Sequence, residues 1–326
     1  MGTWFANALR ATVFGLCGLL FGTAAQAAPS KVIVGTYINK VQEVSFRDSR
    51  IAIDFYIWFR WKPEGELKEY KPLESMELIN GRVDAKSSVV EKKIGELNYA
   101  SARITATIFK TWGLETFPFD NHQVRVYLED SQYFASDLEF QPDLTNSRLG
   151  DELSLPGWRL SDFAIEAMPK TYKTNYGDTS APTDAASTYS RLSFGMTMWR
   201  DGWGTAVKLL STVVFATLVS FVVFGIKPSD VDPRFGLGVG ALFAVAASAF
   251  VVASTQPDSG VLTIADQMHI VAMGFIFGSV VQSAFCLKWD EAGLEERYKK
   301  VDFWSLILFP LFFLGWTAWL VSKAFR

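Results

Sequence analysis

The sequence has few cysteines and histidines and no excess of positive charge. Its 326 residues include 2 cysteines and 2 histidines, and 31 Lys and Arg stand against 34 Asp and Glu. This balance excludes a strongly basic, nucleic-acid-binding protein, and a hydrophobic content of 49 % excludes a disordered chain. His122 and His269 are far apart, and no Cys, His or acidic cluster has metal-ligand spacing, so we expect neither a metal nor a cofactor.

Recognisable catalytic motifs are missing as well. The chain has no Ser-His-Asp arrangement, no phosphate-binding glycine loop and no paired-carboxylate motif in a cleft-forming context. We therefore do not expect an enzyme.

The first 27 residues have the layout of a secretory signal peptide. Arg10 precedes an apolar run over residues 11–21, and the small residues Ala25 and Ala27 follow around Gln26. The alternative is a membrane anchor, but about eleven apolar residues are too few to span a ~30 Å hydrocarbon core. Cleavage after Ala27 would leave Cys286 as the one remaining cysteine, which excludes a disulfide within the exported part.

Residues 28–200 alternate between apolar and polar positions. From residue 51 to 61 every odd position is large and apolar, and the even positions include Asp54 and Arg60. This period of two is typical of a strand with one buried face, and similar stretches recur between turn-rich segments. The pattern predicts an extracellular, immunoglobulin-like antiparallel β-sandwich of about ten strands.

Residues 201–326 follow a helical membrane pattern instead. Four stretches of 18 to 20 residues, 209–226, 235–254, 270–287 and 303–322, contain no Asp, Glu, Lys or Arg. Each is long enough to cross a bilayer as a helix, so we expect an all-α bundle of four transmembrane helices. Lys and Arg occur in the first and third connections and not in the second, which places the N-terminal domain outside.

The second of these stretches is unusually rich in Gly, Ala and Ser. One helical face carries Gly236, Gly240, Phe243, Ala247, Phe250 and Ser254. Repeated around an axis, this face would line a pore that apolar rings close by dewetting. The alternative is tight helix packing through the small residues of the same stretch.

Short motifs occur in a characteristic order along the chain. They are Tyr70-Lys71-Pro72 with Ile79-Asn80, Phe117-Pro118-Phe119-Asp120, Arg200, Arg234 followed by Gly236-Leu237-Gly238, Pro257, and Asp266-Gln267-Met268. In this order and spacing the chain resembles the pentameric ligand-gated ion channels of the Cys-loop receptor superfamily, most closely the prokaryotic branch. The resemblance implies a homopentamer surrounded by lipids of a cell inner membrane, with a periplasmic ligand-binding domain and a pore lined by the second helix.

The chain departs from the family pattern at several positions. Val124 stands at the family's second cysteine position, and His122 stands where Gln is usual. At the inner end of the second helix, Asp232 and Arg234 are the candidate selectivity residues, and Pro233 lies between them in place of the Glu common in cation channels. The glycine run after Arg234 is similar to that of anion-selective members, so the sequence leaves charge selectivity open.

The resemblance also implies a ligand site between neighbouring sandwiches, under a loop at residues 178–187. By analogy with an amine-gated relative, its candidate residues are Glu129, Tyr133, Tyr176, Tyr189 and, on the opposite face, Arg103. A carboxylate and aromatic faces suit an ammonium group, so the agonist is a small molecule such as an amine, or alternatively protons. Ordinary strand aromatics and a solvated acid are the other interpretation of these residues.

Further roles concern coupling and pH. The resemblance places Asp120, Arg200 and Pro257 at the junction of the two halves, where an acid–arginine pair could transmit gating. These residues could instead act only locally, on a turn and at the headgroups. His269, close to Asp266, is either a proton sensor or a satisfied interfacial side chain. A non-conducting, membrane-tethered periplasmic solute-binding protein is the main functional alternative to a channel, and a four-span structural protein is a third.

Overall fold

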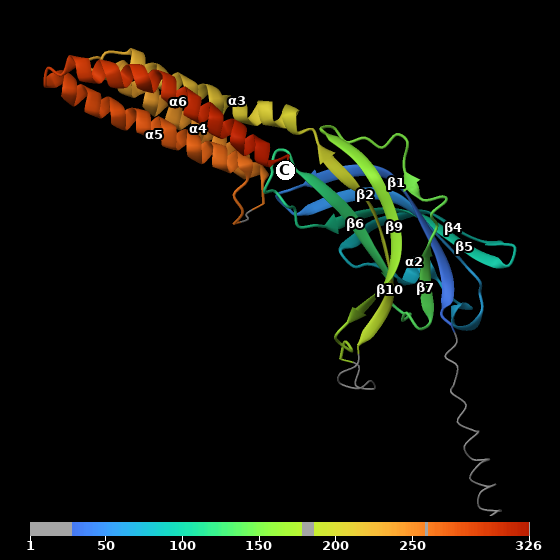
Figure 1. Cartoon of the computed structure of the whole chain (residues 1–326). Helices are drawn as coiled ribbons and strands as arrows, with labels where there is room; N and C mark the ends of the chain where they lie inside the picture. The colour runs from blue at the N-terminus through green and yellow to red at the C-terminus, as the bar shows by residue number, and fades with distance from the viewer. Residues whose placement is uncertain (1–27, 178–185, 258–259, 326) are drawn as a thin grey trace, which may run out of the picture.

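The structure, a computed structural model, describes residues 28–177, 186–257 and 260–325. The predicted signal peptide and residues 178–185 of the predicted ligand loop lie outside the described residues. Figure 1 shows the strands at one end of an elongated molecule and the long helices at the other.

The N-terminal part is a two-sheet sandwich, as the alternating pattern predicts. One sheet has the order β4-β5-β2-β1-β7, with β8 also paired to β1, and the other has the order β3-β6-β10-β9. Strands β7 and β8 run parallel to β1, whereas the other pairs are antiparallel. The strands are β1 Ser30–Ser45, β2 Arg50–Trp61, β3 Met76–Leu78, β4 Gly81–Ile94, β5 Leu97–Phe109, β6 Asn121–Asp130, β7 Leu138–Pro142, β8 Arg148–Leu149, β9 Trp158–Tyr172 and β10 Ser187–Arg200. Two short helical turns, η1 Gly65–Leu67 and α2 Pro72–Ser75, precede β3.

The core between the sheets is built from the alternating residues. The odd positions of β2 are buried, and Phe55 on this strand packs edge-on against Phe194 of β10 with ring centroids 5.1 Å apart. Phe59 meets Phe140 of β7 at 6.5 Å. Each such side chain stabilises the fold by about 1.5–3 kcal/mol through removal from water. Without a disulfide, this packing holds the two sheets together.

Four long helices follow the sandwich. They are α3 Gly202–Ser220 with its 3₁₀ continuation η2 Phe221–Gly225, α4 Val231–Thr255, α5 Ile264–Glu291 and α6 Glu295–Lys323. Within the described residues, these four are long and apolar enough to cross a membrane, which confirms the predicted architecture. The charged connection expected between the last two helices is mostly helical, since only residues 292–294 separate α5 from α6.

The sandwich and the helical bundle share one continuous core at their junction. Ala206 of α3 and Met268 of α5 belong to the same buried cluster as the sandwich interior. The backbone N–H of Ala265 donates to the carbonyl of Phe117 at 3.3 Å. Figure 1 places the C-terminus at this junction, where Phe325 packs against Phe119 at 5.3 Å. The last helix therefore returns to the sandwich side of the bundle.

Candidate functional site: pore helix, junction and outer aromatic cluster

One face of α4 is exposed in the part of the chain that the structure describes. All six residues of the predicted pore face are exposed: Gly236, Gly240, Phe243, Ala247, Phe250 and Ser254. The two phenylalanines are 73 % and 75 % exposed. The opposite face carries buried residues, including Ala241 and Val245, and packs on α3 and α5. The predicted pore residues therefore form one continuous face that a single chain leaves uncovered.

The glycines of α4 differ in what surrounds them. A Cβ atom at Gly238 would lie 2.4 Å from Cγ2 of Val280 on α5, so this glycine permits close helix packing. Gly236 and Gly240 have nothing within 4 Å of the same position. Close helix packing through small residues, the alternative interpretation of this stretch, therefore applies to Gly238. The two glycines of the predicted pore face have free space around them.

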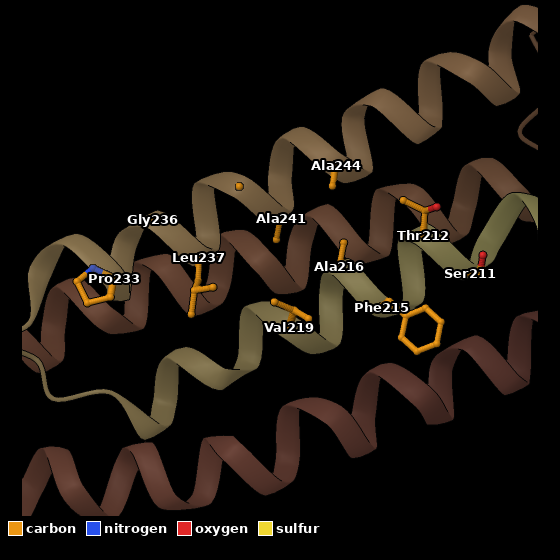
Figure 2. Close-up of a pocket in the computed structure, with 11 residues that line it drawn as sticks. Ser211, Thr212, Phe215, Ala216, Val219, Pro233, Gly236, Leu237, Ala241 and Ala244 are labelled. Carbon is orange, nitrogen blue, oxygen red and sulfur yellow. The ribbon is translucent and has the colours of Figure 1, made fainter.

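A groove of about 820 Å³ runs between α3 and α4 on the outside of the bundle. Figure 2 shows Leu237 and Ala241 of α4 pointing toward α3, and Ala216 of α3 pointing toward α4; Phe215 and Val219 of α3 also line the groove. Gly236 and Gly240 complete the α4 wall. The groove is apolar, so in a membrane it will be covered by lipid or by another protein surface.

At the end of α4 farthest from the sandwich, a buried arginine takes part in a hydrogen-bond network that connects α4, α5 and α6. Nη2 of Arg234 donates to both carboxylate oxygens of Asp302 on α6 at 2.8 Å, and the arginine is fully buried. Gln282 of α5 donates to the same carboxylate at 3.1 Å. The Arg234 charge is therefore neutralised away from the exposed face of α4, while Asp232, the other candidate selectivity residue, is exposed.

The predicted coupling residues Asp120 and Arg200 form an ion pair at the junction. Arg200 donates from Nε and Nη2 to the two oxygens of Asp120, at 2.7 and 2.9 Å. Nε2 of His122 lies 2.5 Å from the same carboxylate, and all three side chains are largely buried. Burial alone would raise the pKa of Asp120, but the hydrogen bonds from His122 and Arg200 outweigh it and lower that pKa below its usual range.

Aromatic rings surround this ion pair. The guanidinium of Arg200 lies 4.1 Å from the ring centroid of Trp158 and 4.7 Å from that of Phe46. Phe46 belongs to the turn between β1 and β2, and the next residues of that turn, Arg47 and Asp48, line one hollow with Pro257 beyond the end of α4. The ion pair thus connects the start of β6, the end of β10 and the first turn close to the end of α4.

The outer ligand residues are brought together only in part. Tyr176 and Tyr189 both contact the ring of Tyr172, each with centroids 6.0 Å apart. Glu129 is buried beside them, where it accepts a hydrogen bond from the hydroxyl of Tyr172 at 3.2 Å. Burial and the Glu129 charge raise the pKa of Tyr172, so its hydroxyl stays protonated at neutral pH.

Two further candidates lie elsewhere in the chain. Arg103 of β5 pairs with Asp54 of β2 at 3.0 Å, in the other sheet. Tyr133 packs its ring against Tyr70 with centroids 5.4 Å apart, and its hydroxyl donates to the carbonyl of Glu66. Within one chain, neither residue touches the cluster around Glu129.

His269 has partners for both of its ring nitrogens. Nδ1 lies 2.7 Å from the carbonyl oxygen of Ala265, and Nε2 lies 3.1 Å from the hydroxyl of Ser248. Because a carbonyl oxygen only accepts hydrogen bonds, Nδ1 carries a hydrogen and donates to it. A neutral imidazole satisfies both contacts. This arrangement favours the satisfied interfacial histidine over the proton sensor.

Some site residues were missed by sequence reasoning. Arg191 donates to Glu129 at 2.6 Å, and the alternation of β10 would have placed it on the same face as Tyr189. Asp302 was overlooked because it lies just before the apolar stretch of the last helix. Within the described residues, no group of three or more metal-ligating side chains occurs.

The fold and these sites define a multi-pass membrane protein with an N-terminal extramembrane β domain and a free face on its second helix. The chain is 25 % identical over 288 residues to pH-sensitive chloride channel 2 of Anopheles gambiae, covering 79 % of this chain and 45 % of the relative. It is 22 % identical over 264 residues to pH-sensitive chloride channel 2 of Drosophila melanogaster, covering 76 % and 48 %. No family model matches the sequence.

The chain is therefore distantly similar to proteins named as pH-sensitive chloride channels. It spans less than half the length of these two relatives.

Proposed function

We propose that this chain is the subunit of a homopentameric ligand-gated ion channel of a prokaryotic type, inserted in a cell inner membrane with its sandwich on the periplasmic side. The observation that carries the proposal is the exposed face of α4, because six residues from Gly236 to Ser254 are left exposed by the part of the chain that the structure describes. One helix cannot enclose a pore, so the face requires further copies around an axis. The number five comes from the family resemblance.

Complementary surfaces support a ring of identical subunits. The groove between α3 and α4 is apolar and has small residues on one wall, whereas α5 presents bulky exposed residues on its own free side. Ile270, Phe277 and Phe285 are each at least half exposed there. Insertion of one copy's α5 ridge against the α3 wall of the next copy's groove would leave Gly236 and Gly240 on the side of the axis. Such a head-to-tail contact forms a ring where the rotation between copies closes.

The proposed gating runs from the sandwich through the Asp120–Arg200 pair to α4. A stimulus that tilts the outer domains would move the first turn and β10 together, because Arg200 is packed against Phe46 and paired with Asp120. The end of α4 lies beside that turn. A small rotation of α4 would then open and wet the rings formed by Phe243 and Phe250.

Protons are the stimulus that the junction supports best. His122 shares the Asp120 carboxylate with Arg200, and its other neighbours are the rings of Phe46, Trp112 and Trp158. Lys110 reaches the Trp112 ring at 5.5 Å and is the nearby cation outside the pair. His122 and Arg200 share one carboxylate, so the loss of either side chain should alter the coupling contact. Both relatives carry pH sensitivity in their names.

We propose anions as the permeant ions. The Gly236-Leu237-Gly238 run is similar to that of anion-selective family members, and both relatives are named as chloride channels. The buried pairing of Arg234 with Asp302 means that this arginine would act by fixing the helix end rather than by touching ions.

The proposal is tested by recording currents from the purified protein in planar bilayers over a pH series, with reversal potentials in asymmetric salt. We expect pH-dependent currents that reverse near the chloride potential, and a pH response that His122→Gln alters while His269→Gln leaves it in place. Pentamers that stay silent at every pH and with added small amines would overturn the channel and favour the tethered solute-binding protein.

A further inference from the structure

The outer end of the second sheet holds an aromatic cluster around a single guanidinium group. The group belongs to Arg191 of β10, and the rings of the cluster belong to Tyr127, Phe134, Tyr172, Tyr176 and Tyr189. This cluster contains three of the residues that the family resemblance assigns to ammonium binding: Glu129, Tyr176 and Tyr189.

Arg191 makes both of the contacts that an ammonium ligand would need. Its Nε donates to Glu129 at 2.6 Å, and its Nη2 donates to the hydroxyl of Tyr172 at 2.7 Å. The guanidinium carbon lies 5.0 Å from the ring centroid of Tyr127 and 6.0 Å from that of Tyr172, within cation–π range. The side chains of Arg191 and Glu129 are only 12 % and 4 % exposed.

Strand register fixes this arrangement. Leu192 of β10 pairs with Leu128 of β6, so the next residues in each direction, Arg191 and Glu129, lie directly opposite each other. Strand β10 pairs with β6 on one edge and with β9 on the other. Tyr172, at the end of β9, therefore reaches Arg191 from the side opposite β6. The contact is therefore built by backbone pairing and does not depend on residues 178–185.

We propose that Arg191 determines ligand specificity by occupying the ammonium position of this cluster, so that the wild-type site rejects amines. An incoming ammonium would have to displace a guanidinium that is already hydrogen-bonded to Glu129 and Tyr172. The displaced charge would lose a buried partner, which is unfavourable.

Removal of the guanidinium should create an amine site. In Arg191→Ala, the Glu129 carboxylate and the faces of Tyr127 and Tyr172 are left without their cation, and a small quaternary or primary ammonium can replace it. The site would offer an ammonium group both cation–π contacts and a carboxylate, away from water. We therefore expect its affinity for amines to rise by at least about tenfold. The double variant Arg191→Ala, Glu129→Gln removes the carboxylate charge as well, and so tests whether amine binding depends on Glu129.

The experiment is a calorimetric titration of the purified full-length protein with tetramethylammonium and with propylammonium, at constant ionic strength. Wild type and Arg191→Lys should show no saturable binding at this site up to the highest amine concentration used. Arg191→Ala should bind with a dissociation constant at least about tenfold below that concentration, and the double variant should lose this binding. If Arg191→Ala does not fold, Arg191→Gln takes its place with the same expectation.

Two results would overturn the proposal. One is wild-type binding as tight as that of the Ala or Gln variant, which would mean that Arg191 does not occupy the position. The other is a folded Ala or Gln variant that binds neither amine. The inference rests on the proposed function only in treating the cluster as a ligand site, and the titration needs no current, so a failed channel assay and a failed binding assay remain distinguishable.

Discussion

At the scale of single residues, three largely buried arginine–carboxylate pairs lie in the outer cluster, at the junction and at the far end of the bundle. Arg191 pairs with Glu129 in the outer cluster, and Arg200 pairs with Asp120 at the junction. Arg234 pairs with Asp302 at the far end of the bundle. Loss of one partner from such a buried pair leaves an uncompensated charge, which costs more than the pair itself contributes.

Asp120→Asn should lower the free energy of unfolding by about 3 kcal/mol at neutral pH, because Arg200 then lacks its counter-ion. The lowered pKa of Asp120 means that the native state favours the ionised form. This stabilisation is therefore complete above the unfolded-state pKa of about 3.9 and is lost as the pH falls through the native pKa. Thermal unfolding of wild type and variant from pH 3 to 8 should show curves that converge only in the acid range.

The matched control for this substitution is Asp151→Asn, at an exposed position of the sandwich. Its effect should stay within about 0.5 kcal/mol at every pH. A constant difference between Asp120→Asn and wild type down to pH 3 would contradict the account of the ion pair.

At the scale of elements, α4 has one buried and one exposed face. The buried face packs against α3 and α5 through small residues, and the exposed face carries the proposed pore lining. The two kinds of glycine on this helix allow the faces to be tested separately.

Gly238→Ala should destabilise the bundle by about 1–3 kcal/mol, because the new methyl group would overlap Cγ2 of Val280 and force α4 and α5 apart. Gly240→Ala meets open space in the chain and should keep or raise thermal stability through its better helix propensity. We expect the second substitution to lower single-channel conductance, since it adds bulk to the proposed pore face. Equal melting temperatures for the two variants would contradict this division of faces.

Much of this architecture was predictable from the sequence. Alternation located β2 and β10, and the absence of charge located the four helices. Strand β4 was not predicted, because it buries almost nothing along its length and so carries no alternating pattern. The side-chain pairings were harder still, since Arg191–Glu129 and Arg234–Asp302 depend on register and helix packing between segments more than 60 residues apart.

At the scale of the whole molecule, the proposed ring brings five copies of the free α4 face together around an axis. Asp232 is exposed at the end of α4 farthest from the sandwich, and its carboxylate would oppose anion entry there. Asp232→Asn should raise the permeability ratio of chloride to sodium, measured as a shift of reversal potential in asymmetric salt. The control Asp290→Asn, beyond the membrane-spanning part of α5, should leave the reversal potential unchanged.

The most direct test of the central claim is the single-channel conductance of Phe243→Ala beside that of Phe312→Ala. Both phenylalanines are highly exposed in one chain, but Phe243 lies on the proposed pore face of α4 and Phe312 lies on α6. The account predicts that Phe243→Ala widens the apolar ring and changes conductance or the closed-state current, whereas Phe312→Ala leaves both at wild-type values. Equal behaviour of the two variants, in pentamers that conduct, would show that this face of α4 does not line the pore.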